Sequence, residues 1–375
     1  MSLPHEVVID ARWLRTGIGR YILTLLQDLK QKLPDSLLTC ITMPGQVGAV
    51  ASYCDRVIEM KCGIYSVMEQ ARLPLVAPGA SVFCAPHYNV PVFRTGPLVV
   101  TIHDLTHILF TGYRSRLRVR AYAEPMLRIA CTRAARIVTP SHYTRQMLIE
   151  RLRADPEKIS VIPCAVNDVF RPQDKSEAAA QVQTSYGVSK PYILFVGSTA
   201  PHKNLITLLA AYQRLSAKFR DIPALVLVLP QNSPPSSTDA TLLSLMASPG
   251  VRCLDAVTDR SLASLYSAAI MTVVPSFEEG FGLPVIESMA CGTPVACSRT
   301  ASLPEIAGDD AIYFAPGSAD SVASAIEQLL CSDKLQQRLA VGGLERAARY
   351  SISRAATSYA SVVSSIISRN AQVFP

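Results

Sequence analysis

The sequence predicts an α/β protein with two open, doubly wound parallel-sheet domains that face each other across a cleft. The chain has 375 residues, which is more than one ordinary core of ~150 residues accommodates. Apolar segments of strand length alternate with longer stretches of helical period, and this indicates parallel strands covered by helices on both faces. The alternation is interrupted once by a polar segment and then begins again. We therefore expect two sheets of the same kind.

The first domain is expected over residues 1–172. The segment RTGIGRY joins its first strand to a long amphipathic helix, and Gly17 and Gly19 bring the backbone close to the cleft. The glycine fingerprint of a dinucleotide-binding domain would need a third glycine, at Ile22. The sequence therefore argues against a dinucleotide oxidoreductase. Strands of this domain are expected at residues 7–9, 37–41, 81–85, 98–102, 135–139 and 159–163.

The polar segment 173–190 is expected to be a linker, and a second domain is expected over residues 191–350. The remaining segment, 351–375, contains an amphipathic helix rich in Ala and Ser over about 351–369. No strand follows this helix, so it must pack on a domain that is already built. Strands of the second domain are expected at residues 192–197, 224–229, 251–255, 270–275, 294–298 and 311–315.

Composition predicts a well-packed cytoplasmic protein. Hydrophobic residues make up 49% of the chain and charged residues 17%, and no apolar run approaches the ~18 residues of a membrane-spanning helix. Asp10 and Arg12 come too early for a secretory signal. The 10 cysteines include no C-x-x-C pair. We expect them to be small buried side chains rather than members of disulfides or a metal site.

The net charge of +7 is concentrated in the first half of the chain, above all between residues 111 and 153. Such a surface attracts phosphate on lipid headgroups, on an acidic acceptor or on nucleic acid. A solvated basic helix surface without a partner is the other interpretation. Aromatic residues that could contact bases are not interleaved with these arginines, which argues against nucleic acid. The basic residues are Arg114, Arg116, Arg118, Arg120, Arg128, Arg133, Arg136, Arg145, Arg151 and Arg153.

The segment SFEEGFGLPVIE predicts an anion site in the second domain. It follows the strand IMTVVP, and Pro284 suits the first position of a helix that Gly292 would end. Glu279 then lies in the strand-to-helix loop and Glu287 in about the first helical turn. A helix start offers unpaired amides and partial positive charge, and the glycines between the acids let a ligand approach. Two solvated carboxylates of no function are the alternative interpretation.

Two further sequence features place polar groups at strand ends. YILFVGSTAPHKNL runs from a strand through Gly197 to a second helix start, where Lys203 could contact a phosphate or remain an exposed lysine. TIHDL ends a strand of the first domain and places His103 and Asp104 at the sheet edge. Because ligands of open α/β sheets bind at the carboxyl ends of strands, the functional interpretation is favoured at both places.

Together these residues resemble the family 4 glycosyltransferases, retaining enzymes with two Rossmann-like domains in the GT-B arrangement. The resemblance covers nearly the whole chain and is most specific in the block PSFEEGFGLPVIESMACGTPVACS. It implies an acceptor-side first domain, a nucleotide-sugar-binding second domain and a C-terminal helix that crosses back to the first. It also implies no cofactor beyond the nucleotide-sugar donor.

The resemblance implies a role for each site residue. Glu287 would hold the nucleotide ribose, Glu279 the hydroxyls of the donor sugar, and His103 that sugar near its reacting carbon. Many members carry an arginine directly after the glycine matched by Gly197, whereas this chain has Ser198, so Lys203 must neutralise more of the diphosphate. The remaining donor-site residues would be Gly17, Val257, Gly280, Phe281, Gly282 and Leu283.

The resemblance also guides the reaction that we expect. The absence of any D-x-D sequence argues against a divalent metal bridging the phosphates. The motifs are similar to those of bacterial mannosyl- or hexosyltransferases of O-antigen or exopolysaccharide assembly, so GDP-mannose is the first choice of donor and a UDP-hexose the second. A lipid-diphosphate-linked saccharide at the inner membrane face would be the acceptor, and the arginine-rich region would contact the anionic leaflet. A nucleotide-sugar 2-epimerase of the same architecture and a non-catalytic partner are the alternatives.

Overall fold

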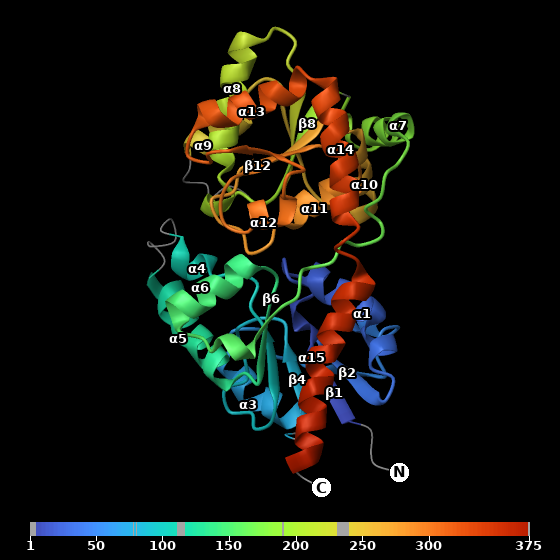
Figure 1. Ribbon diagram of the computed structural model, residues 1–375, viewed down its shortest axis with the longest axis vertical. Coiled ribbons are helices and arrows are strands. Elements are labelled where there is room, and N and C mark those ends of the chain that lie inside the picture. The colour runs from blue at the N-terminus through green and yellow to red at the C-terminus, as the bar shows by residue number, and fades with distance from the viewer. Residues whose placement is uncertain are drawn as a thin grey trace. The chain divides into compact units, whose positions relative to one another are not determined.

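The structure is a computed structural model and describes residues 5–77, 79, 81–110, 117–189, 191–230 and 240–373. The chain forms two compact units, one of residues 1–165 with 351–375 and one of residues 166–350. Each contains one entirely parallel sheet (Figure 1). The two parallel-sheet domains predicted from the alternation of strands and helices are confirmed.

The sheet of unit 1 has seven strands in the order β3-β2-β1-β4-β5-β6-β7. Strands β4 and β5 near its centre are buried along their whole length, and their sequences, VFCA and LVVT, are almost entirely apolar. The neighbouring β1 is buried from Val7 to Asp10. The edge strand β3 was not predicted, because it is partly exposed and its sequence (RVIE) mixes charged and apolar residues. The strands are β1 (His5–Asp10), β2 (Ser36–Thr42), β3 (Arg56–Glu59), β4 (Val82–Ala85), β5 (Leu98–Thr101), β6 (Arg136–Thr139) and β7 (Ile159–Val161).

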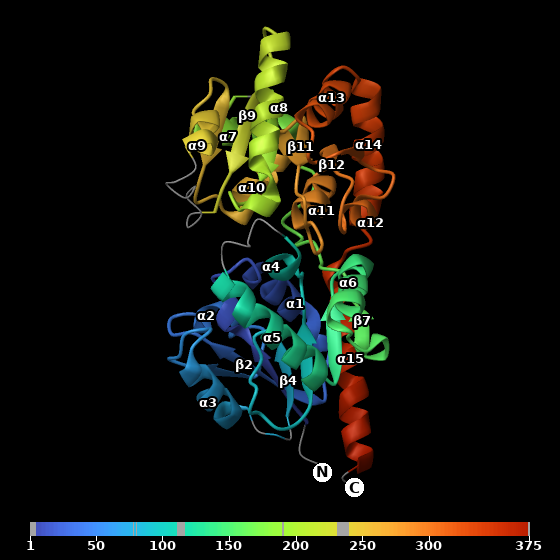
Figure 2. The same ribbon diagram turned by 90° about the vertical axis from the view of Figure 1, so that its left-hand side faces the viewer.

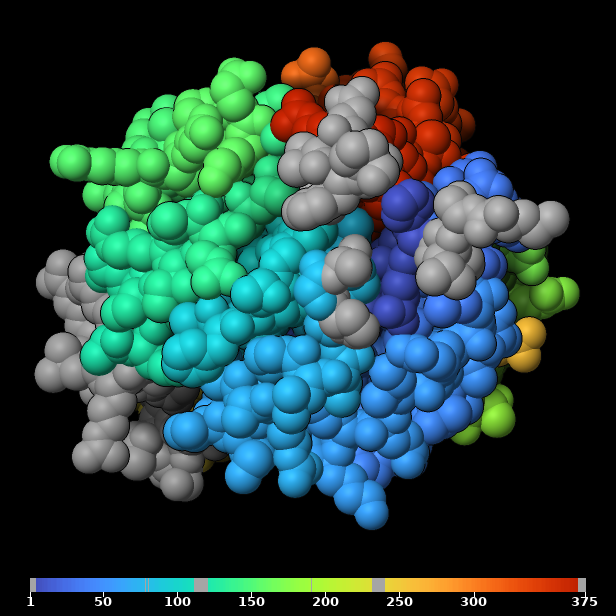
Figure 3. Space-filling view, turned by 90° about the horizontal axis from the view of Figure 1, so that it is seen from below, coloured from blue at the N-terminus to red at the C-terminus, as the bar shows by residue number. Residues whose placement is uncertain are grey.

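Helices cover both faces of this sheet. One face packs against α1 and α15, and the other against α3, α5 and α6. The C-terminal helix α15 therefore belongs to the first unit, where its red atoms lie against blue N-terminal segments (Figure 3). The helices are η1 (Ala11–Trp13), α1 (Gly19–Lys32), α2 (Val47–Val50), α3 (Val67–Val76), α4 (Thr106–Leu109), α5 (Leu117–Arg133), α6 (His142–Leu152), η3 (Pro156–Lys158) and α15 (Ile352–Val373).

The sheet of unit 2 has six strands in the order β10-β9-β8-β11-β12-β13. One face packs against α8, α9 and α13 (Figure 2). The strands are β8 (Tyr192–Val196), β9 (Ala224–Val228), β10 (Val251–Leu254), β11 (Met271–Val274), β12 (Val295–Ser298) and β13 (Ile312–Phe314). The helices are α7 (Lys175–Tyr186), η4 (Pro201–Lys203), α8 (Leu205–Lys218), α9 (Ala240–Met246), α10 (Asp259–Ala268), α11 (Leu283–Ala290), α12 (Leu303–Ala307), α13 (Ala319–Leu330) and α14 (Asp333–Ala347).

The segment 173–190, expected to be a linker, differs from that expectation because it contains α7. Asp174 caps this helix by accepting the amides of Ser176 and Glu177, and Gly187 ends it in the left-handed conformation. The helix packs on α10 of unit 2. Its polar surface had suggested a linker, but a helix on the outside of a sheet buries only one narrow stripe, here Ala178 and Val182.

The described helices include none that is both long and apolar enough to cross a membrane. All 10 cysteines are free thiols, and most are buried. This agrees with their expected role as small core side chains.

Candidate active site

The loop between β11 and α11 places the glutamate and glycine motif at the carboxyl edge of the second sheet. Gly282 precedes α11 with a φ of +106°, a conformation that favours glycine. A Cβ at this position would also lie 2.7 Å from Cδ2 of Leu303. The helix begins at Leu283 rather than at Pro284 and ends at Ala290, so Glu287 occupies its second turn and not its first.

Ser302, which lies outside every predicted motif, holds this loop in place through hydrogen bonds. Its Oγ lies 2.8 Å from the carbonyl oxygen of Glu279 and 2.9 Å from that of Phe281. The ring of Phe281 packs edge-on against Tyr350, with 5.6 Å between ring centroids. Ser302 is fully buried, so its hydroxyl joins the α12 segment to the backbone on both sides of Gly280.

Glu279 and Lys203, predicted from separate motifs, form an ion pair. Lys203 Nζ lies 2.7 Å from Glu279 Oε1, and the hydroxyl of Ser276 donates to the same oxygen at 2.7 Å. The Lys203 side chain is 22% exposed and that of Glu279 11%, so both groups are accessible to a ligand. The arrangement offers a cation that can move from a carboxylate to an incoming phosphate.

Asn204 fixes the position of Lys203. It adopts the left-handed conformation (φ 55°), and its side-chain amide donates to the carbonyls of Pro275 at 2.9 Å and Pro316 at 2.7 Å. The amide of Phe277 donates to the carbonyl of His202 at 2.8 Å. The turn η4 is thus attached to the loop that carries Glu279.

The glycine and serine before this turn have local contacts. The amide of Gly197 donates to the carbonyl of Val228 at 3.1 Å, and a Cβ at Gly197 would lie 3.1 Å from the ring of Phe195. The hydroxyl of Ser198 accepts from the amide of Ala200 at 3.4 Å. Ser198 therefore supports the turn and supplies no second cation there.

Glu287 is buried, with 1% of its surface exposed. Its Oε2 accepts the hydroxyl of Tyr266 at 3.1 Å, which attaches α11 to α10. Tyr266 was not predicted as a contact of Glu287, because a tyrosine among the buried residues of a helix is expected to be a core residue. Val257 lies half-buried in the loop between β10 and α10, just before Thr258, which caps α10.

His103 and Gly17 lie in unit 1. The Nε2 of His103 donates to the carbonyl of Pro86 at 3.0 Å, which leaves Nδ1 as an acceptor. Burial lowers the pKa of His103, so the ring is neutral at pH 7. The rings of His103 and Tyr21 are nearly perpendicular, with centroids 4.6 Å apart. A Cβ at Gly17 would meet no atom within 4 Å.

Both residues line a pocket of about 330 Å³ within unit 1, inside the ~300–1,000 Å³ range of small-molecule sites. Aromatic rings from three segments form much of its wall, and Asp104 adds a carboxylate. The lining residues are Trp13, Thr16, Gly17, Ile18, Ile64, Tyr65, His87, Tyr88, His103, Asp104 and His107. Of these residues, only Gly17, His103 and Asp104 belong to motifs that predicted a site.

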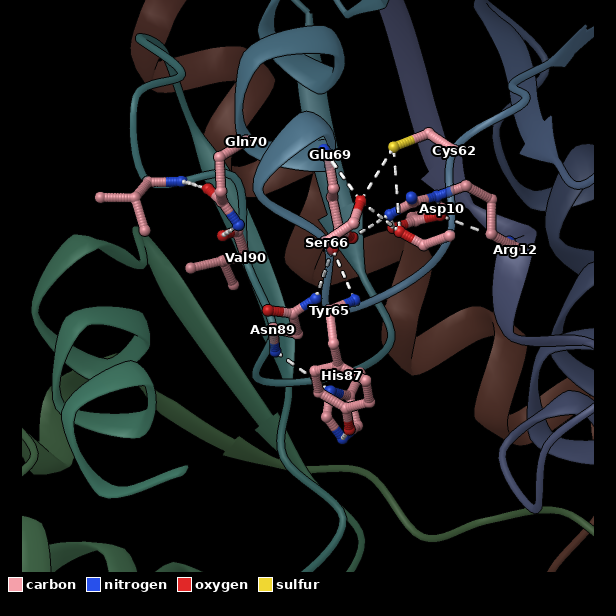
Figure 4. A network of polar contacts seen from close by, with 12 residues as sticks. Asp10, Arg12, Cys62, Tyr65, Ser66, Glu69, Gln70, His87, Asn89 and Val90 are labelled. Atoms are coloured by element: carbon pink, nitrogen blue, oxygen red, sulfur yellow. Dashed lines mark hydrogen bonds and ion pairs between the residues drawn. The ribbon is translucent and has the colours of Figure 1, made fainter. Parts of the chain in front are cut away.

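A buried polar network stands behind this pocket and is centred on Glu69 (Figure 4). Arg12 donates to Asp10 through Nε at 2.7 Å and Nη2 at 2.6 Å, and also to Glu69. Burial by itself would lower the pKa of Arg12, but the carboxylates of Asp10 and Glu69 outweigh burial and raise that pKa. Glu69 Oε2 accepts from the side-chain amide of Asn89 and the backbone amide of Tyr65, each at 2.9 Å.

The arginine-rich region does not form one free basic face in the part of the chain that is described. Arg128 pairs with Glu124 at 2.9 Å, and Arg133 donates to the carbonyls of Val92 and Arg94. Arg114 and Arg116 lie outside the described residues, as do the side chains of Arg118 and Arg120.

No group of three or more His, Cys, Asp or Glu side chains among the described residues could hold a metal ion. Unit 2 contains the Lys203–Glu279 ion pair, the glycine-bounded start of α11 and the buried Glu287. Unit 1 contains the aromatic pocket. Each unit is a Rossmann-like parallel sheet with polar side chains at the carboxyl ends of its strands, which is where open α/β sheets bind nucleotides and other ligands.

Comparison with known proteins identifies the family. Residues 179–346 match the Glycosyl transferases group 1 family, and residues 69–170 match Glycosyltransferase Family 4. The chain is 31% identical over 275 residues to O-antigen chain mannosyltransferase B of Escherichia coli, covering 72% of this chain and 70% of that protein. This chain belongs to the family 4 glycosyltransferases, as its motifs predicted, and it is a hexosyltransferase enzyme.

The chain is also similar to other glycosyltransferases and to solved structures of the same fold. O-antigen chain mannosyltransferase RfbU of Salmonella typhimurium is 25% identical over 331 residues, covering 84% of this chain and 87% of that protein. D-inositol 3-phosphate glycosyltransferase of Segniliparus rotundus is 29% identical, covering 68% of this chain and 58% of that protein. The solved sucrose-phosphate synthase of Thermosynechococcus elongatus has the same fold, with a TM-score of 0.74 at 20% identity and 99% coverage of both chains.

Proposed function

We propose that this enzyme moves a hexose, with retention of configuration, from a nucleotide-diphosphate sugar to a saccharide acceptor. The observation that supports this most directly is the Lys203–Glu279 pair beside the glycine-bounded start of α11. This grouping offers a cation and the backbone amides of a helix start for a diphosphate, and a carboxylate for sugar hydroxyls.

The binding roles follow from the chemistry of each group. Lys203 exchanges Glu279 for the diphosphate, and Glu279, freed from the pair, accepts hydrogen bonds from the hydroxyls of the donor sugar. The amides around Phe281, Gly282 and Leu283 bind the diphosphate, with Gly197 and Ser198 beside it. Glu287 holds the ribose while Tyr266 keeps its other oxygen in place. Val257 lines the base, and Gly17 and His103 contact the donor from unit 1.

The difficult step is cleavage of the bond between the anomeric carbon and the diphosphate. Negative charge grows on the leaving phosphate and positive charge on the sugar. Groups that are already oriented toward the growing negative charge stabilise the transition state most, and Lys203 and the helix start are such groups. The departing phosphate oxygen takes the proton of the attacking acceptor hydroxyl, so no separate protein base is required.

The leaving-group chemistry is proposed to need no divalent metal. Lys203 and backbone amides supply the positive charge that a metal would otherwise contribute. Activity should therefore persist in excess EDTA, measured as nucleotide release after the enzyme has been dialysed against the chelator. Loss of activity that is restored by Mg²⁺ or Mn²⁺ would reject this part of the proposal.

GDP-mannose is the proposed donor, because two relatives that cover 70% or more of each chain are named O-antigen mannosyltransferases. A UDP-hexose is the second choice. A thermal-shift screen of GDP, UDP and ADP with their hexose conjugates tests this, since a ligand at 100 times its Kd stabilises the folded state by about 2.7 kcal/mol. Stabilisation by a UDP-sugar alone would move the assignment to the second choice.

The proposed acceptor is a saccharide linked to a lipid diphosphate in surface polysaccharide synthesis. The relatives named D-inositol 3-phosphate glycosyltransferase make a phosphorylated small acceptor a second candidate. Transfer of labelled hexose to each acceptor class separates the two. Nucleotide release that is indifferent to every acceptor would instead favour a 2-epimerase.

We further propose that the enzyme works at the inner, anionic membrane face, through the basic region 114–153. Exposed Arg128, Arg151 and Arg153 would contribute ~1 kcal/mol each near such a surface. Flotation with vesicles containing 30% anionic lipid should recover the protein at low salt and lose it at high salt. Equal recovery with neutral vesicles would contradict this proposal.

A further inference from the structure

The pocket of unit 1 has aromatic walls suited to the face of a sugar ring. Trp13 stacks on His87 with centroids 4.1 Å apart and an interplanar angle of 26°. The ring of Tyr65 is nearly perpendicular to that of Trp13, with centroids 5.3 Å apart, and the ring centroids of Tyr88 and His87 are 3.9 Å apart. Aromatic side chains combine apolar faces with polar edges, which matches the alternation of C–H faces and hydroxyl rims on a pyranose.

The charge of the pocket opposes an anionic ligand. No lysine or arginine is found among the lining residues in the described part of the chain. Burial lowers the pKa of His87 to about 3 and also lowers that of His103, so both rings are neutral at pH 7. For Asp104, hydrogen bonds from Thr106 outweigh burial and lower the pKa, so its carboxylate is charged.

The carboxylate of Asp104 at the pocket wall is available to ligand hydroxyls. Asp104 Oδ1 accepts the amide of Thr106 at 2.8 Å, and its carboxylate has further lone pairs for hydroxyl donors.

The network around Glu69 makes this wall rigid. Glu69 holds the backbone amide of Tyr65 and the side chain of Asn89, and it binds Arg12, the neighbour of Trp13. The hydroxyl of Tyr122 donates to Asn89 from α5. Residues from η1, α3, α5 and the segment after β4 are thereby joined directly behind the aromatic rings, and a preorganised wall lowers the entropy cost of binding.

We propose that this pocket binds the terminal, uncharged sugar ring of the acceptor and discriminates against phosphorylated acceptors. The ring would lie on the aromatic wall, with hydroxyls directed to Asp104. The inference rests on the proposed transferase function and narrows it. It favours a neutral saccharide end over the phosphorylated small acceptor named for some relatives.

Trp13 is the only tryptophan of the chain, so its fluorescence reports on this pocket alone. The full-length enzyme is titrated with methyl α-D-mannopyranoside, glucopyranoside and galactopyranoside, and with the 6-phosphates of the same hexoses. At least one neutral hexoside should change the emission saturably. Its 6-phosphate should bind roughly tenfold more weakly, because a phosphate carries about −1.5 to −2 charges beside a carboxylate.

Asp104→Asn is the matched variant. Asparagine keeps the oxygen that accepts the Thr106 amide but removes the charge, so the tenfold preference should shrink to within about threefold. Asp221→Asn, an exposed change in unit 2, should leave the preference unchanged. Circular dichroism of both variants establishes that each is folded.

Turnover of GDP-mannose and UDP-hexoses, measured as nucleotide release, separates this inference from the proposed function. Turnover without any saturable response to neutral hexosides would overturn the inference, and so would equal or tighter binding of the 6-phosphates. The enzyme could instead bind neutral hexosides more tightly than their 6-phosphates without turning over any nucleotide sugar. That result would support sugar binding in the pocket and contradict the proposed transferase function. An unchanged preference in Asp104→Asn would overturn the assigned role of its charge.

Discussion

Lys203 and Glu279 lie 76 residues apart in sequence, yet Lys203 Nζ and Glu279 Oε1 are 2.7 Å apart at the carboxyl edge of one sheet. Each was selected from its own motif, one as a phosphate contact and one as a sugar contact. Their pairing means that the positive charge is held in place before any ligand arrives. A group positioned in advance does not have to be reorganised during the reaction.

Replacement of Lys203 should therefore act mainly on catalysis. Lys203→Ala is expected to lower kcat/KM about 100-fold, which corresponds to roughly 3 kcal/mol of transition-state stabilisation. Steady-state nucleotide release measures it. Lys218→Ala removes a lysine that pairs with Glu327 on the outside of the same unit and should change kcat/KM less than about twofold. Similar losses in the two variants would contradict the role of Lys203.

Ser302→Ala removes the hydroxyl that bridges the carbonyls of Glu279 and Phe281. Leaving buried acceptors unsatisfied costs about 1–3 kcal/mol, so the midpoint of chemical denaturation should fall. Because the same loop supplies the diphosphate amides, KM for the donor should rise as well. The Ser288→Ala control breaks a hydroxyl contact with Thr272 deep in the unit and should lower stability without raising KM.

Glu287 and Tyr266 can be separated by mutation. Tyr266→Phe removes the hydroxyl that donates to Glu287 Oε2 at 3.1 Å and should cost about 1 kcal/mol of stability. Glu287→Gln keeps the shape of the side chain but removes its charge, and a ribose contact predicts a rise in KM of about tenfold with little change in kcat. An unchanged KM in Glu287→Gln would show that Glu287 only joins α11 to α10.

The stability of unit 1 should decrease as the pH falls below about 6.5, the ordinary pKa of histidine. Burial and the neighbouring His103 lower the pKa of His87 to about 3, while Asp104 opposes them and His107 adds to them. Between these values the unfolded chain binds a proton that the folded chain does not, so stability rises with pH by about 1.4 kcal/mol per unit. From pH 7.5 to pH 5 this histidine should contribute a loss of about 2 kcal/mol.

Urea titrations followed by Trp13 fluorescence at pH 7.5 and pH 5 measure this effect. His87→Phe keeps an aromatic ring against Trp13 but cannot bind a proton. The variant should be less stable at pH 7.5, because the amide of Asn89 loses its acceptor, but it should lose about 2 kcal/mol less on acidification. An equal loss in both proteins would show that other groups, carboxylates above all, set the acid response.

The sequence by itself determined the two parallel sheets, the motif loops at their edges and the family. These depend on local patterns: apolar runs of strand length, Gly282 before a helix start, and Gly197 after a strand. The sequence did not predict α7, because only a narrow apolar stripe of this helix packs on the rest of the unit. Ala178 and Val182 form that stripe, and the other residues of the helix are mostly polar.

Only the tertiary structure decided which polar groups meet. The contacts of Ser302 with the Glu279 loop, of Tyr266 with Glu287, and of Glu69 with Arg12 join residues 21 to 57 positions apart. No local periodicity encodes such pairs, because each depends on how separate segments pack. The same holds for the aromatic pocket, where Trp13 and His87 are brought together by the adjacency of β1 and β4.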